Sequence, residues 1–273
     1  MAKLSMFDQM KIFAAKQVLS YVDSDPENNL PRLISMIQGS DAGEKAGIPG
    51  MEKIKERLGN RDSGWYRLLL SLWTDVDKSV RNRIFENIIA KAGPKKEGEP
   101  WSLLEYDRQG YGWEPSAEEK QADSSVILLA DCRGSSERLQ ELLKTCESRR
   151  DMIFAPVLEP HQTDEAVCES MLKAGNSVPV LWLGREEEEQ EEAFARLRKS
   201  RLLFGAMKRY GEDTAEEVSG GDFADKICSA GAKALWLEAC EREEREWRRA
   251  VRERTISCIN EKPLIIFETG SFL

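Results

Sequence analysis

Histidine is nearly absent from this sequence, since His161 is the only one in 273 residues. A His-rich metal site is therefore excluded, because one imidazole cannot supply the ligands that such a site needs. The six cysteines contain no CxxC pair and lack the dense spacing of a disulfide-stapled secreted domain. We expect most of them to be reduced thiols.

Long apolar runs are also missing, and none approaches the ~20 residues that a membrane helix requires. Near the amino terminus, Asp8 and Lys11 interrupt the segment that would form the apolar core of a signal peptide. The formal net charge of −9 disfavours non-specific attraction to nucleic acid phosphates or anionic lipids. We therefore expect a cytoplasmic protein that binds neither nucleic acid nor membrane.

Short apolar runs are present instead, and they recur through the second part of the chain with helix-length polar stretches between them. Parallel strands that are buried on both faces have this appearance, and helices connect them. The expected strands are residues 101–106, 126–130, 152–157, 178–183, 202–206, 234–237 and 263–267. The expected helices between them are residues 135–147, 164–174, 186–199, 223–230 and 241–258.

Residues 1–92 show helical periodicity, and we expect them to form an N-terminal helical region. Prolines in segments 25–26 and 29–31 are expected to end the first helix and begin the next. Ser63 is the expected N-cap of a later helix. The first helix carries an apolar stripe at three-to-four spacing, which consists of Phe7, Met10, Phe13, Ala14, Val18, Leu19 and Val22.

The segment 93–100, GPKKEGEP, contains no apolar residue and has breakers at both ends, which indicates a linker. Two parts follow from this boundary: the helical region at 1–92 and a parallel (β/α) unit at 101–273. Six or seven strands are too few for an eightfold barrel of ~250 residues. The predicted fold class is α/β, with an incomplete (β/α)6-7 barrel preceded by helices.

Two stretches in the helical region, LSYVDSDPENNLP at 19–31 and WYRLLLSLWTDVD at 65–77, are followed by Val80 and Arg81. They resemble the amino-terminal region of a bacterial group of radical S-adenosylmethionine proteins. In that group a short linker, a proline and a tryptophan lead into a partial (β/α) barrel, and Pro100 and Trp101 are similarly placed here. The resemblance implies a barrel of the radical S-adenosylmethionine type.

The same resemblance implies a CxxxCxxC motif after the first strand, where three thiolates hold a four-iron cluster. In this sequence the position is occupied by DRQGYGWEP at 107–115, which contains no cysteine. The glycine-rich GGEP segment of the family, near the methionine amino group, is replaced by ADCRG at 130–134. We therefore expect no iron–sulfur cluster, no S-adenosylmethionine cleavage and no other cofactor, and we assign no metal ligand.

Some residues at the expected strand ends still offer chemistry. Cys132 lies beside Arg133, and a neighbouring arginine can favour a reactive thiolate, although a buried, inert cysteine is the commoner case. No base is identifiable beside Cys132, so we assign no catalytic residue. His161, after the third strand, is expected to be an exposed loop residue.

Charged groups near the same ends form the candidate ligand-binding set. Lys208 and Arg209 follow the expected fifth strand and could hold a phosphate or carboxylate, although a surface pair is the commoner case. Glu105, Asp107 and Glu238 could supply a carboxylate pair. The candidate ligand-binding residues are Asp131, Arg133, Lys208 and Glu238.

Two functional hypotheses follow. In the first, the chain is a catalytically silent radical S-adenosylmethionine-like protein, a pseudoenzyme that serves as a partner, scaffold or regulatory subunit of an active paralogue or of its substrate. Its protein partner would be that paralogue or a second copy of the chain. In the second, the strand-end loops form the site of a repurposed enzyme or small-molecule-binding protein. A decayed copy without a selected activity is a third reading of the same losses.

Overall fold

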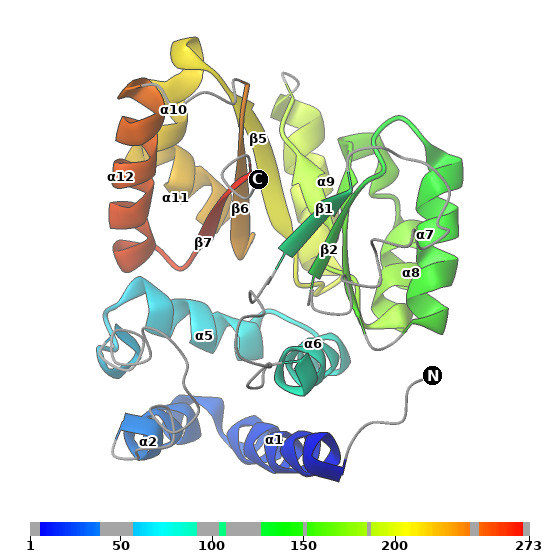
Figure 1. Ribbon diagram of the computed structural model, residues 1–273, viewed down its shortest axis with the longest axis vertical. Helices are drawn as coiled ribbons and strands as arrows, with labels where there is room; N and C mark the ends of the chain where they lie inside the picture. The colour runs from blue at the N-terminus through cyan, green and yellow to red at the C-terminus, as the bar shows by residue number, and fades with distance from the viewer. Residues whose placement is uncertain are drawn as a thin grey trace.

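One parallel sheet forms the centre of the molecule in the computed structural model (Figure 1). The model describes residues 6–38, 57–91, 104–107, 127–149, 152–184, 187–240 and 246–269. Its seven strands lie in sequence order, each parallel to its neighbours. They are β1 (Leu104–Asp107), β2 (Ile127–Asp131), β3 (Ile153–Leu158), β4 (Val180–Trp182), β5 (Gly205–Tyr210), β6 (Ala234–Ala239) and β7 (Ile265–Thr269).

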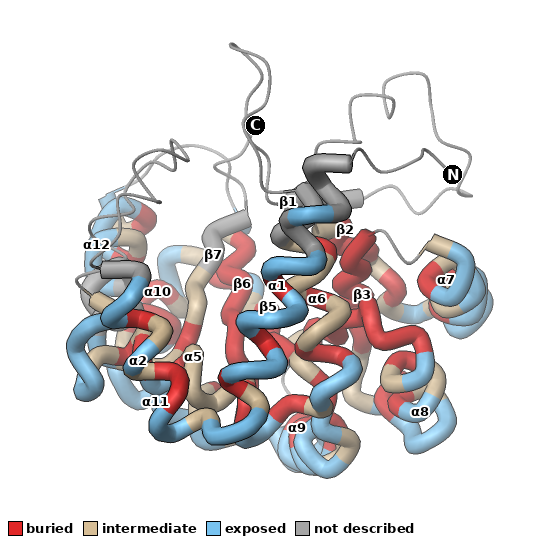
Figure 2. The backbone as a smooth tube through the Cα atoms, turned by 90° about the horizontal axis from the view of Figure 1, so that it is seen from below, coloured by how far each residue is buried: buried red, intermediate tan, exposed pale blue. Residues whose placement is uncertain are grey.

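The sheet curls, and helices cover its convex side as an arc (Figure 2). This arrangement is an incomplete parallel barrel, as the run of apolar segments predicted. The helices of the arc are α7 (Ser136–Ser148), α8 (Glu165–Ala174), α9 (Glu187–Lys199), α10 (Ala215–Ser219), α11 (Gly221–Ser229) and α12 (Glu246–Glu261). Two short 3-10 turns, η2 (Pro160–Gln162) and η3 (Glu212–Thr214), follow β3 and β5. None of the described helices has the length and apolarity needed to cross a membrane.

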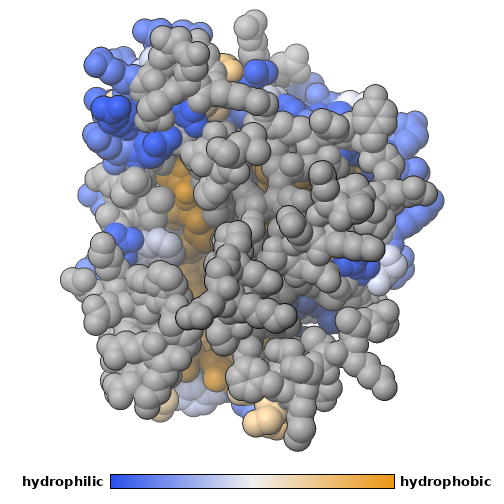
Figure 3. Space-filling view, viewed as in Figure 1, coloured by the Kyte–Doolittle hydropathy of each residue, from blue (hydrophilic) through white to orange (hydrophobic). Residues whose placement is uncertain are grey.

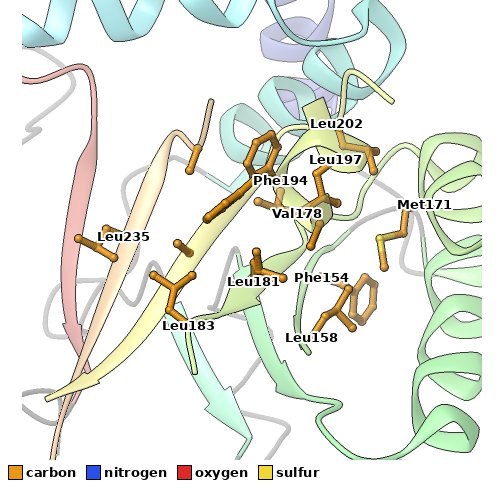
Figure 4. Close-up of a cluster of buried hydrophobic side chains, with 14 of the residues drawn as sticks. Phe154, Leu158, Met171, Val178, Leu181, Leu183, Phe194, Leu197, Leu202 and Leu235 are labelled. Atoms are coloured by element: carbon orange, nitrogen blue, oxygen red, sulfur yellow. The ribbon is translucent and has the colours of Figure 1, made fainter. Parts of the chain in front are cut away.

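Alternating side chains divide the strands between two apolar clusters. The outer cluster joins strand residues such as Leu181 and Leu235 to helix residues such as Met171 and Phe194 (Figure 4). The inner cluster lies on the concave side of the curl, and its described members all come from strands. Its buried members are Leu129, Ala155, Val157, Val180, Met207, Ala234 and Trp236, each at most 9% exposed.

The amino-terminal part consists of α1 (Met6–Ser24), α2 (Pro26–Gln38), α5 (Gly64–Thr74) and α6 (Lys78–Lys91). These helices have a small core of their own, which includes Leu19, Val22 and Ile34. In addition, Val80 and Ile84 of α6 belong to the outer cluster of the barrel. The helical part is therefore packed onto the barrel through shared apolar contacts.

Hydrogen bonds fix this packing at the amino-terminal ends of the strands. The Asp77 amide donates to the Arg201 carbonyl oxygen at 2.7 Å, just before β5. Lys233, just before β6, places Nζ 2.5 Å from Asp75 Oδ2. Asn87 Nδ2 donates to the carbonyl oxygen of Met152, just before β3, at 3.3 Å. The helices consequently close the base of the barrel and leave the carboxyl ends of the strands on the opposite side (Figure 1).

Several predicted boundaries of the helical region can be compared with this structure. Ser63 caps α5, because its Oγ accepts from the Tyr66 amide at 3.1 Å, which confirms the predicted cap. The break at Pro26 is also confirmed, because α1 ends at Ser24 and α2 begins at Pro26. Segment 29–31 was expected to take part in the same break, but it does not, since Pro31 lies inside α2. The predicted linker at 93–100 lies outside the described residues.

The apolar stripe predicted for the first helix is wrong as a single buried face. Ala15, Leu19 and Val22 are buried, whereas Met10 and Phe13 are 62% and 65% exposed. The helix carries two apolar arcs, and only one of them meets the neighbouring helices. The other arc faces away from the core of the helical part.

Candidate functional site

The carboxyl end of β2 places two of the predicted residues together. Asp131 is the last residue of β2 and alternates with Leu129, so it belongs to the inner face of the curl. Arg133 follows in the turn, and its guanidinium binds Asp131 with two hydrogen bonds, from Nε to Oδ1 at 2.8 Å and from Nη2 to Oδ2 at 2.6 Å. This bidentate geometry is the strong form of an arginine–carboxylate pair.

Strand β4, which is separated from β2 by β3, contributes an aromatic surface to this pair. The Arg133 guanidinium carbon lies 3.9 Å from the centre of the Trp182 ring, a cation–π contact. Trp182 is the last residue of β4 and packs against the inner cluster. Arg133 therefore lies between a carboxylate and an indole at the mouth of the curl.

The electrostatics of Asp131 reflect this arrangement. Partial burial raises the pKa of its carboxyl group, but the hydrogen bonds and charge of Arg133 oppose this effect, and the net result is a lowered pKa. The side chains of Asp131 and Arg133 are 20% and 26% exposed. The pair is thus charged at neutral pH and only partly screened by solvent.

Hydrogen bonds join the loops that follow β2 and β3. The Gly134 amide donates to Glu159 Oε2 at 3.1 Å, and Gly134 adopts a positive φ of 68° that favours glycine. Gln162 Nε2 donates to the Cys132 carbonyl oxygen at 2.8 Å. His161, which extends from η2, is 67% exposed in its side chain, as expected for a loop residue. These contacts hold the Asp131–Arg133 turn in place.

The other two predicted ligand-binding residues, Lys208 and Glu238, lie on opposite faces of the sheet. The sequence placed Lys208 after the fifth strand, but β5 runs from Gly205 to Tyr210, so Lys208 lies within it. Its Nζ is 3.5 Å from Glu217 Oε1 of α10, on the helix-covered outer side of the sheet. The prediction that Lys208 points into the mouth is therefore wrong, because strand alternation directs it outward. Arg209, on the inner face, is the residue that faces the mouth.

Glu238 is the fourth predicted residue, and it lies in β6 on the same face as Trp236. It is 9% exposed and is paired in register with Arg209 of β5. Asp131, Arg133, Arg209 and Glu238 together give the inner mouth two acidic and two basic groups. Glu105 and Asp107 lie in β1, in which Asp107 is the last residue.

Sequence reasoning missed the aromatic part of this mouth. Trp182 of β4 and Trp236 of β6 project to the inner face. Both are paired in register with Met207 of β5, which lies between the two strands. Gly205 makes room for the second indole, since a Cβ there would overlap the ring of Trp236. The available signal was the alternation of Trp182 with Val180 and of Trp236 with Ala234 along their strands.

The cysteines in the described part of the chain do not gather into the ligand set of the iron–sulfur cluster that the family resemblance implies. Burial raises the pKa of the Cys146 and Cys228 thiols to about 11 and also raises that of Cys168, so these thiols are neutral in the protein as described. Cys132 is buried in the outer apolar cluster. Among the described residues, no three His, Cys, Asp or Glu side chains form a metal-binding group. The segment 108–126, which includes most of the cysteine-free replacement, lies outside the described residues.

The two sequence segments that carry the resemblance, 19–31 and 65–77, contact each other in the helical part at the base of the barrel. Asp23 of segment 19–31 accepts a hydrogen bond from Trp73 Nε1 of segment 65–77 at 3.0 Å. The same carboxylate binds Arg81 Nη2. The Arg81 guanidinium lies 4.9 Å from the centre of the Trp73 ring, and Lys78 Nζ is 3.0 Å from the second oxygen of Asp23. We call Asp23, Trp73 and Arg81 the base hub.

Comparison with models of known protein families and with curated proteins finds no match for this chain.

Proposed function

We propose that this chain is a cluster-less relative of the radical S-adenosylmethionine proteins that acts as a non-catalytic partner or regulatory subunit. Its associate would be an active paralogue or the substrate of that paralogue. A partial parallel barrel closed at its base by helices is the architecture that the resemblance implies, which supports this proposal. The barrel type and the subunit role are parts of the proposal.

The observation that carries the proposal is the contrast between the two ends of the barrel. At the base, Asp23 and Trp73 come from the segments 19–31 and 65–77 that resemble the family, and Arg81 follows the second segment. The side chains of these three residues contact one another and are at most 9% exposed. At the mouth, the segment that replaces the family's GGEP holds Asp131 and Arg133, which satisfy each other's charge. The scaffold residues are kept, and the residues for reductive cleavage are replaced.

Anaerobic reconstitution tests the non-catalytic part of the proposal. The purified chain is incubated with iron and sulfide beside an active family member as positive control. Iron and sulfide content, the visible spectrum and S-adenosylmethionine cleavage are then measured. We expect a stoichiometric cluster and cleavage only in the control. A stoichiometric cluster with cleavage in this chain would overturn the proposal.

Association tests the subunit part. The chain is mixed with an active family member from the same genome, and the mixture is analysed by size-exclusion chromatography with light scattering. A complex that changes the activity of the active member supports a regulatory role. If no family member or family substrate associates with the chain, the subunit proposal fails.

The mouth geometry favours a second function, binding of a small ligand that carries both an aromatic ring and a charged group. Arg133 lies on the Trp182 ring and binds Asp131, so a ligand here would replace one of these contacts, and Glu238 adds a carboxylate on the same face of the sheet. Lys208 does not belong to this set. A thermal-shift screen of amino acids, nucleosides and aromatic carboxylates tests this function. A stabilising ligand should lose its effect with Arg133→Gln and keep it with Lys208→Gln, and equal losses in both variants would argue against the mouth.

A further inference from the structure

The exposed side of the two amino-terminal helices is unusual in composition. All five large apolar side chains that are exposed in the described part of the chain lie on α1 and α2, and they are Met10, Phe13, Val18, Tyr21 and Met36. Figure 3 shows light orange surface at the lower edge of the molecule, where Figure 1 has these helices. Soluble monomers seldom gather their exposed apolar residues in one place, and such a patch indicates an interaction surface.

Charge is absent from the same side of α1. At 100° per residue, Met10, Phe13, Gln17, Ser20 and Tyr21 lie opposite the buried arc of the helix. We call these five residues the α1 strip, and none of them is charged, although 33% of the whole chain is charged. A partner that covers the α1 strip would therefore bury no unpaired charge, whereas a strongly charged partner would find no complement there.

The order of residues along the strip favours a second copy of this chain as the occupant. When two α1 helices pack antiparallel about a two-fold axis at Gln17, residues equally distant from Gln17 meet each other. Phe13 of one copy then meets Tyr21 of the other, an aromatic pair. Ala14, beside the strip, and Ser20, within it, are small, so they do not obstruct this pair. A different protein would need to carry its own matching surface.

The size of the surface fits a dimer of moderate strength. The 19 residues of α1 extend for about 28 Å. A contact about 10 Å wide along α1 and along the roughly 20 Å of α2 would bury roughly 1,000 Å² over both copies, which is in the range of weak, reversible interfaces. Association should therefore depend on concentration in the micromolar range.

We propose that this chain forms a two-fold symmetric dimer through the α1 strip, with the adjacent face of α2 at its edge. Because α1 and α2 lie at the base of the barrel, both mouths remain open on the outside of the dimer (Figure 1). The dimer would carry two copies of the mouth, which face away from each other. This inference goes beyond the subunit proposal and does not depend on whether the chain binds a cluster.

Sedimentation velocity of the full chain between about 1 and 200 μM tests the dimer. We expect a reversible monomer–dimer equilibrium, and Phe13→Glu should raise the dissociation constant at least about tenfold, because it places a charge in the centre of the interface. Gln140→Glu adds the same charge on the exposed side of α7 and should have no effect. Added salt should strengthen the dimer slightly, because it screens the repulsion between two copies that each carry a net charge of −9.

A cysteine on the proposed axis provides a second test that does not depend on the fold of the Phe13 variant. Gln17 is exposed, and Gln17→Cys should form a disulfide-linked dimer under mild oxidation. Gln140→Cys and the unmodified chain, which already has the exposed Cys240, serve as controls. A monomeric wild-type chain at 200 μM, together with equal cross-linking of the two variants, would overturn the dimer. Binding of an active paralogue at the strip in place of a second copy would also overturn it, while supporting the subunit proposal.

Discussion

The base hub gives the sharpest test of how the helical part is held together. The Arg81 side chain is 4% exposed and that of Asp23 is 9% exposed, so their ion pair is shielded from water. In Arg81→Met the carboxylate of Asp23 would stay buried without its guanidinium. The contact of Arg81 with the Trp73 ring would also be lost. We therefore expect a clear loss of stability.

The magnitude follows from the burial of the pair. Removing one partner of a buried ion pair typically costs about 3–5 kcal/mol. Trp73 Nε1 and Lys78 still contact Asp23 in the variant, which places the expected loss nearer about 2–3 kcal/mol. Lys78 binds the same carboxylate but is 68% exposed, so Lys78→Met should cost less than about 1 kcal/mol.

Urea denaturation monitored by tryptophan fluorescence and far-UV circular dichroism measures these free energies of unfolding. A double variant with Asp23→Asn and Arg81→Met should lose less stability than the sum of its single variants, because the second substitution removes a charge that the first left unpaired. Equal losses in Arg81→Met and Lys78→Met would refute the reasoning. Additive losses in the double variant would also refute it.

Three further predictions use the barrel. Gly205→Ala should lower the free energy of unfolding by about 1–3 kcal/mol in urea denaturation, because its Cβ would lie 2.8 Å from a carbonyl oxygen of β6, whereas Gly221→Ala meets open space. Cys228, whose pKa burial raises to about 11, should react with a thiol reagent much more slowly than exposed Cys240 in peptide-mapped labelling. The lowered pKa of Asp131 stabilises the fold above its ordinary value of 3.8, so the stability advantage of wild type over Asp131→Asn should disappear as acid titration passes below that value.

The sequence was sufficient to predict the strand order but not the strand boundaries. Apolar runs identified the strands because strands such as β3 and β6 are buried on both faces along nearly all of their length. The same continuity concealed where each strand begins. The run at 202–206 lies mostly before β5, and this error placed Lys208 beyond the strand and at the mouth. A run without polar residues shows no alternation of polar and apolar side chains, so its sequence does not indicate where the strand begins. In the structure, the pairing of Gly205 with Ala234 sets the register of β5 against β6.

The amino-terminal helix shows a related difficulty. Its apolar residues fill two arcs, and sequence periodicity alone cannot identify which arc is buried. The contacts of Leu19 and Val22 with Leu30 and Ile34 in the helical core decide the matter. At the mouth, the pairing of Asp131 with Arg133 could have been predicted from the sequence, because the two residues are only two positions apart. The stacking of Arg133 on Trp182 could not be predicted, because it depends on how β2 and β4 are placed on either side of β3.

The two ends of the barrel also differ in how freely they can change. The side chain of each member of the base hub is at most 9% exposed and contacts at least one other member, so a single replacement leaves a polar group without its partner. Asp131 and Arg133 are partly exposed, and solvent can satisfy either side chain after a replacement at little cost to folding. Substitutions are therefore tolerated less well in the segments 19–31 and 65–77 than at the mouth of the barrel. For this reason the resemblance carries more information about the scaffold than about the chemistry, and the function of this chain has to be sought in its mouth and in the surfaces of its helices.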